Sequence, residues 1–75
     1  MDPDAIARVT KEVVRTYGEM QGITPTVRRE TQATQEHYIL TYKARVSVPG
    51  GKQMSRIVRV TADSRGHVQR ISTSR

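Results

Sequence analysis

The sequence predicts a two-layer α+β domain, in which an N-terminal helix packs on one face of a four-stranded antiparallel meander sheet. Apolar residues recur every three or four positions over residues 6–20, whereas they alternate with other residues over residues 37–48. Strong turn signals stand at residues 49–52 and 63–66. Because the chain has only 75 residues, we expect residues 1–75 to form one small domain.

The composition also favours β structure. The chain contains nine Val, five Ile and nine Thr, but only one Leu and neither Phe nor Trp. β-branched side chains suit a pleated surface better than a helix. We therefore expect strands to supply most of the domain.

The predicted helix begins near Pro3, because proline is favourable at the first helical position and Asp2 is suited to cap the free backbone N–H groups. Its apolar stripe consists of Ile6, Val9, Val13, Tyr17 and Met20. Glycines predict that the helix ends between residues 18 and 22. We expect the stripe to pack against the sheet.

The four strands are expected at residues 26–31, 37–48, 54–62 and 67–74. Pro25 confines the first strand to an edge of the sheet or to a start after the proline. Residues 32–35 form the expected connection to the second strand.

The loop Pro49-Gly50-Gly51 predicts how the second and third strands pair. A three-residue loop pairs Val48 with Lys52 and, farther along, Leu40 with Val60, which keeps apolar residues on one face. A five-residue loop would preserve the same alternation, so three residues is the preferred length of the two.

The turn at residues 63–66 predicts the pairing of the third and fourth strands. It has the pattern of a type I turn followed by a glycine in the left-handed conformation. With this turn, we expect Val60 to pair with Val68.

These registers assign the side chains to two faces. The helix side is expected to hold Val27, Tyr38, Leu40, Tyr42, Val46, Val58, Val60 and Val68. The opposite face is expected to carry Ile39, Ile57 and Ile71 beside Lys43, Arg45 and Arg59. Arg56 and Arg70 fall on the helix side, where long stems lie over apolar surface and keep their charge in water. The alternative for these two residues is an anion pocket at the uncovered end of the sheet.

Positive charge is concentrated in the second half of the chain. Residues 37–75 contain eight Lys and Arg but one acid, Asp63, whereas residues 1–36 contain five basic and six acidic residues. Ten of the thirteen basic residues are Arg, whose planar fork suits phosphate and carboxylate. The asymmetry favours an anionic partner, with an Arg-rich codon usage as the alternative source of the arginines.

Other classes of function are not expected. The absence of Cys excludes disulfides and thiolate chemistry, and His37 and His67 lack the spacing of a metal site. The Gly50-Gly51 pair lacks the strand-to-helix context of a phosphate loop. No apolar run approaches the ~20 residues that cross a membrane. We therefore expect a cytoplasmic, non-enzymatic protein without a cofactor.

The expected function is binding of nucleic acid or another anionic partner through the basic sheet face. The candidate ligand-binding residues are Lys43, Arg45, Arg59, Arg56 and Arg70. The alternative is a protein-interaction or homodimerisation module that uses the open face or an edge strand. Its candidate interface residues are Ile39, Ile57 and Ile71. A solvated face without a partner is the third interpretation.

Overall fold

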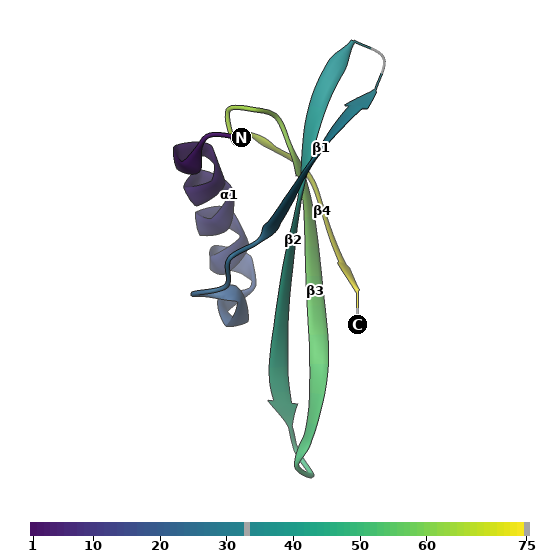
Figure 1. Ribbon diagram of the computed structural model, residues 1–75. Coiled ribbons are helices and arrows are strands. Elements are labelled where there is room, and N and C mark those ends of the chain that lie inside the picture. The colour runs from purple at the N-terminus through teal and green to yellow at the C-terminus, as the bar shows by residue number, and fades with distance from the viewer. Residues whose placement is uncertain (33, 75) are drawn as a thin grey trace.

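The computed structural model describes residues 1–32 and 34–74 and confirms the predicted fold class. In chain order, the elements are α1 (Pro3–Thr16), the short 3-10 helix η1 (Gly18–Met20), β1 (Thr26–Gln32), β2 (Gln35–Val48), β3 (Lys52–Ala62) and β4 (Val68–Ser74). The strands form one antiparallel sheet in the order β1-β2-β3-β4. Figure 1 shows α1 packed beside one face of this sheet. Ala33, in the predicted connection between the first two strands, lies outside the described residues.

A local sequence signal accounts for the start of α1. The Asp2 side chain accepts a hydrogen bond of 3.0 Å from the Asp4 backbone N–H, and Pro3 opens the first turn. At the other end, the Tyr17 backbone N–H donates to the Val13 carbonyl. α1 ends at Thr16, two residues before the predicted range of 18–22, and η1 then places Met20 in the core.

The core lies between α1 with η1 and the inner face of β2 and β3. Its largest fully buried side chains are Tyr42, Met20, Leu40, Val9, Val13, Val58 and Val60. Burying each such aliphatic side chain stabilises the fold by about 1.5–3 kcal/mol. The Tyr42 hydroxyl lies 2.8 Å from the Thr10 hydroxyl of α1, so this buried polar group has a partner across the two layers.

The predicted register of β2 and β3 is confirmed. Val48 pairs with Lys52 and Leu40 pairs with Val60, as a three-residue loop requires. Gly50 and Gly51 both have positive φ angles, of 95° and 77°, which glycine adopts without strain. One continuous alternation therefore divides the side chains of both strands between the two faces.

The predicted register of β4 is wrong. Val60 pairs with Ile71 and not with Val68, which pairs with Ala62. Between these pairs the register shifts at Thr61 and Ala62, so Gln69 is an extra residue on β4. The shift of three residues exchanges the two faces of β4 from Arg70 onward, whereas Val68 lies on the helix side as predicted.

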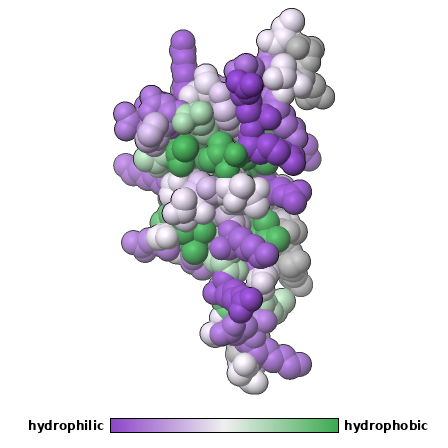
Figure 2. Space-filling view, in the orientation of Figure 1, coloured by the Kyte–Doolittle hydropathy of each residue, from purple (hydrophilic) through white to green (hydrophobic). Residues whose placement is uncertain are grey.

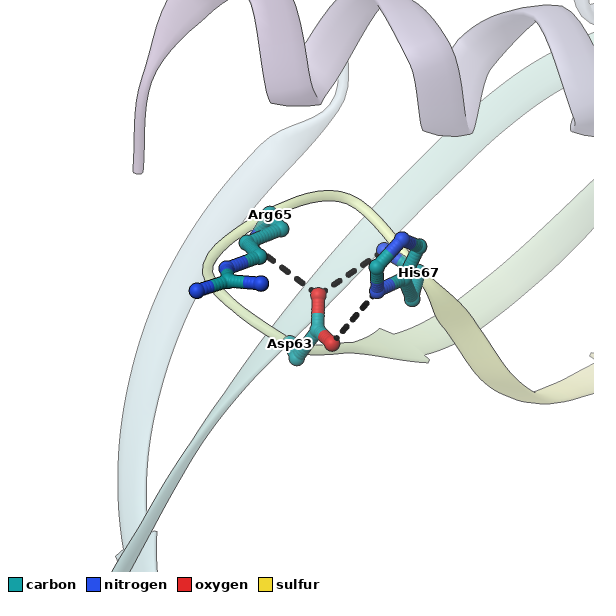
Figure 3. Close-up of polar contacts among 3 residues, drawn as sticks. All are labelled: Asp63, Arg65 and His67. Atoms are coloured by element: carbon teal, nitrogen blue, oxygen red, sulfur yellow. Dashed lines mark hydrogen bonds and ion pairs between the residues drawn. The ribbon is translucent and has the colours of Figure 1, made fainter.

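The loop between β3 and β4 explains part of this shift. Asp63 Oδ1 accepts hydrogen bonds of 2.9 Å from the backbone N–H groups of Arg65 and His67, and Asp63 Oδ2 lies 3.0 Å from His67 Nδ1 (Figure 3). The Asp63 backbone N–H also donates to the His67 carbonyl. These bonds keep residues 63–67 in the loop, so β4 starts later than a four-residue turn predicts.

The helix is too short to cover the inner face of the sheet. α1 and β2 each contain 14 residues, but a strand rises about 3.4 Å per residue and a helix only about 1.5 Å. Ala44 is 6% exposed, whereas Met54, nearer the hairpin tip, is 44% exposed. The expectation that the helix covers Val46 is therefore met only in part, because Val46 is half-buried.

The β2–β3 hairpin consequently extends beyond α1, and we call residues 45–55 the arm. Figure 1 shows the arm continuing past the end of the helix, and the molecule measures 49 × 22 × 16 Å. In Figure 2, hydrophobic surface gathers at the level of α1, whereas the projecting arm is mainly hydrophilic or neutral. The arm is thus held by strand pairing without a covering layer.

Gly66 is predicted to be the glycine least tolerant of substitution. It has a φ of 88°, and a Cβ there would lie 2.7 Å from the Ala5 carbonyl oxygen of α1. Gly66→Ala should lower the free energy of unfolding by about 2–4 kcal/mol, from backbone strain and from displacement of the helix. Gly22→Ala is the matched control, because Gly22 has a φ of 81° but no atom within 4 Å of its Cβ position. Gly22→Ala should lower the free energy of unfolding by about 1 kcal/mol. If urea unfolding showed that Gly66→Ala and Gly22→Ala lose the same free energy of unfolding, a close helix–loop contact would be refuted.

Asp63 should make stability depend on pH. Hydrogen bonds from the His67 backbone and side chain and from the Arg65 backbone lower the pKa of its carboxyl, although desolvation opposes them. A lowered pKa in the folded state means that the stabilisation is present above the ordinary aspartate pKa of about 3.9 and is lost as pH falls through the folded value. An NMR titration that follows the side-chain carboxyl carbon, Cγ, should give a lower pKa for Asp63 in the folded chain than in urea. In addition, Asp63→Asn should reduce the loss of thermal stability in acid; an unchanged acid dependence would contradict the loop's role.

Candidate functional site

The sheet face opposite α1, which we call the open face, is defined by the observed registers. Its members on β1 and β2 are Thr26, Arg28, Glu30, His37, Ile39, Thr41, Lys43, Arg45 and Ser47. Its members on β3 and β4 are Gln53, Ser55, Ile57, Arg59, Thr61, Arg70 and Ser72. The alternation that buries Leu40 and Tyr42 forces their neighbours Thr41 and Lys43 onto this face.

The open face is strongly basic. Among the residues just given, five are Arg or Lys and one, Glu30, is acidic. Arg28 Nη2 lies 2.7 Å from Glu30 Oε1, so that pair is compensated. Within residues 1–32 and 34–74, no ion pair involves the other four, which are Lys43, Arg45, Arg59 and Arg70. All four are exposed.

Arg59 stands between two shallow hollows in this face. A hollow of about 230 Å³ is lined by Thr26, Arg28, Ile39, Thr41 and Arg59. A second hollow of about 130 Å³ is lined by Ile57, Arg59, Ser72 and Thr73. Guanidinium and hydroxyl groups around a shallow depression supply donors that suit a phosphate or carboxylate oxygen.

Arg56 lies on the helix side, as predicted, but its charge is compensated within the fold. Its Nη1 atom donates a hydrogen bond to Glu19 Oε1, and its guanidinium lies 6.0 Å from the centre of the Tyr17 ring. The hydrogen bond from Arg56 and a backbone hydrogen bond hold the pKa of Glu19 below its usual value. Arg56 therefore joins β3 to η1, and we do not include it in the candidate site.

Two other predicted site residues occupy faces opposite to those expected. Arg70, expected on the helix side, pairs with Thr61 on the open face. Ile71, expected on the open face, pairs with the buried Val60 and lies on the helix side, where it is 37% exposed. The extra residue Gln69 causes both exchanges.

The predicted apolar patch is consequently smaller. Ile39 and Ile57 remain on the open face as predicted, and both are half-buried. Without Ile71, the face has two isoleucines among mostly basic and hydroxyl side chains. This composition weakens the argument for a hydrophobic protein interface.

Arg28 is a member of the open face that was not singled out from the sequence. It pairs with Ile39, and its neighbour Val27 pairs with the core residue Leu40. Since Val27 was expected to face the helix, the alternation of the strand was the signal that places Arg28 on the other side.

No protein-family model, curated protein or solved structure matches this chain. In the described part of the chain, no helix has both the length and the hydrophobicity needed to cross a membrane. The same residues contain no cluster of three or more His, Cys, Asp or Glu placed to hold a metal ion.

Proposed function

We propose that this chain is a small non-enzymatic binding domain for nucleic acid, and that the phosphate backbone lies across the open face. The observation that supports it best is the gathering of Lys43, Arg45, Arg59 and Arg70 on one face, with no ion-pair partner among the described residues. Such side chains release counterions when they neutralise phosphates, which is the main source of non-specific affinity.

The spread of these charges favours a polymer over a small anion. Arg45 pairs with Ser55, whereas Arg70 pairs with Thr61, six positions farther along β3. At about 3.4 Å per residue, the two arginines lie at levels of the sheet about 20 Å apart. A single phosphate or carboxylate reaches one or two of these groups, while a repeating polyanion contacts all four. Nucleic acid has that repeating charge, and a cytoplasmic location is part of this proposal.

The second candidate function is a protein interface, and Ile39 and Ile57 are the observation that favours it. Partly exposed isoleucines on a flat sheet offer apolar area to a partner protein. However, two copies that met face to face would bring their basic side chains together, which is destabilising. Light scattering over a range of concentrations tests homodimerisation: a dimer retained at high salt and lost in Ile39→Ser/Ile57→Ser would support it over nucleic-acid binding.

Replacing three open-face charges should abolish most of the salt-dependent binding. The test variant carries three substitutions on the open face, Lys43→Gln, Arg45→Gln and Arg59→Gln. The control variant removes the same charge from exposed positions of α1, with Arg8→Gln, Lys11→Gln and Arg15→Gln. Fluorescence anisotropy with a labelled DNA duplex measures affinity at several salt concentrations. For two or three lost phosphate contacts, the slope of log K against log salt should become less negative by about 2–3.

The α1 variant should keep nearly the slope of the unmodified chain, since its charges lie on the other layer. Circular dichroism establishes that both variants fold. Equal losses in the two variants would mean that net charge alone attracts the DNA, and undiminished binding by the open-face variant would disprove the proposed site.

A further inference from the structure

The arm (residues 45–55) is the part of the open face with the most distinct shape and chemistry. It extends beyond α1, so both sides of this two-stranded ribbon are accessible from Met54 outward. The opposite end of the sheet, the β1–β2 hairpin, has charges that compensate each other in the pairs Arg28–Glu30 and Arg29–Glu36. The arm instead belongs to a stretch, residues 37–62, that contains no Asp or Glu.

Four hydrogen-bonding side chains occupy the open face of the arm. Arg45 pairs with Ser55, and Ser47 pairs with Gln53, so the four form a compact group on two strands. All four are exposed. Arginine recognises guanine O6 and N7, glutamine recognises adenine N6 and N7, and serine bonds to several base edges. This group therefore contains the side chains that read bases, in addition to those that bind phosphate.

We infer that the arm lies in the major groove of B-form DNA with its open face toward the base edges. This inference rests on the proposed function and assigns the nucleic acid, the groove and the residues that read sequence. Arg45 and Gln53 make the principal base contacts. Lys43 and Arg59, farther from the tip on the same face, contact the phosphates that border the groove.

The dimensions of the arm agree with this placement. Its two strands lie about 4.8 Å apart, and the major groove of B-DNA is about 12 Å wide, which admits a two-stranded ribbon with its side chains. The minor groove is only about 6 Å wide. Four cross-strand pairs, from Arg45 with Ser55 to Val48 with Lys52, extend about 10 Å, which corresponds to about three base pairs.

The turn at the tip also suits a confined groove. Gly50 and Gly51 have no side chains, and no atom lies within 4 Å of the position that a Cβ would take at either residue. Two of the three turn residues therefore add no side chain to the tip, and the space around them is open to a groove wall.

Other nucleic acids fit less well. Single strands are held by exposed aromatic rings on which bases stack, but the chain has no Phe or Trp, and Tyr38 and Tyr42 are buried. The remaining Tyr17 is on the helix layer beneath Arg56. Double-stranded RNA has a deep, narrow major groove that side chains do not enter. These features select duplex DNA.

The test selects binding sites from a pool of random-sequence DNA duplexes with the full chain. The unmodified chain should enrich a short motif of about three or four base pairs, and methylation of guanine N7 in the major groove should weaken binding to that motif. Arg45→Ala/Gln53→Ala should lose the preference for the motif over a scrambled duplex by roughly 5- to 100-fold, yet still bind both duplexes in a salt-dependent manner. Val46→Ser/Met54→Gln, on the other face of the arm, should retain the preference.

Three results would overturn this inference. In the first, the chain binds single-stranded DNA or double-stranded RNA more tightly than duplex DNA of equal length. In the second, Arg45→Ala/Gln53→Ala still prefers the motif. In the third, methylation of guanine N7 leaves binding unchanged. If binding nevertheless remains salt-dependent and requires Lys43 and Arg59, the proposed function stands and only the arm's placement fails. If no nucleic acid binds at low salt, both fail together.

Discussion

The structure depends on a mismatch of length between one helix and the strands that it covers. α1 and β2 have the same number of residues, 14, but the rise per residue makes α1 about 21 Å long and β2 about 48 Å long. The helix therefore buries only the middle of one sheet face. Tyr42 lies in this covered region, where burial raises the pKa of its hydroxyl and Thr10 of α1 provides a hydrogen bond.

Two consequences of this mismatch concern function. From Met54 outward the arm has no covering layer, so this part of the ribbon is accessible from both sides. The open face has no second layer either, because the described residues contain no helix other than α1 and η1, which pack on the opposite face. The same residues that build the core determine what the open face displays, since burial of Leu40, Tyr42 and Val58 leaves Thr41, Lys43 and Arg59 on the other side.

The sequence was sufficient to predict one helix and four strands, the strand order and the β2–β3 register, because alternation and turn length are both local signals. It was not sufficient for β4. Asp63 retains the backbone of Arg65 and His67 in the loop, and Gln69 is an extra residue that no periodicity reveals. The extra residue places Arg70 on the open face and Ile71 on the helix side.

Other features of the fold depend on contacts between residues far apart in the sequence. Glu19 and Arg56 are 37 positions apart, so their ion pair follows from the packing of η1 against β3 and not from any local pattern. The approach of Gly66 to Ala5 has the same origin. By contrast, the basic character of the open face was visible in the sequence, because Lys43, Arg45 and Arg59 belong to the two strands whose register was predicted correctly.

The central claim is that the uncovered basic face, and not the helix layer, receives a nucleic acid. NMR of the arginine side-chain Nε–Hε groups, recorded with and without a short DNA duplex, tests it most directly. We predict that the Arg45, Arg59 and Arg70 signals shift on addition of the duplex, while those of Arg8 and Arg15 on α1 do not. Shifts confined to Arg8 and Arg15, or no shift in any arginine at low salt, would contradict the claim.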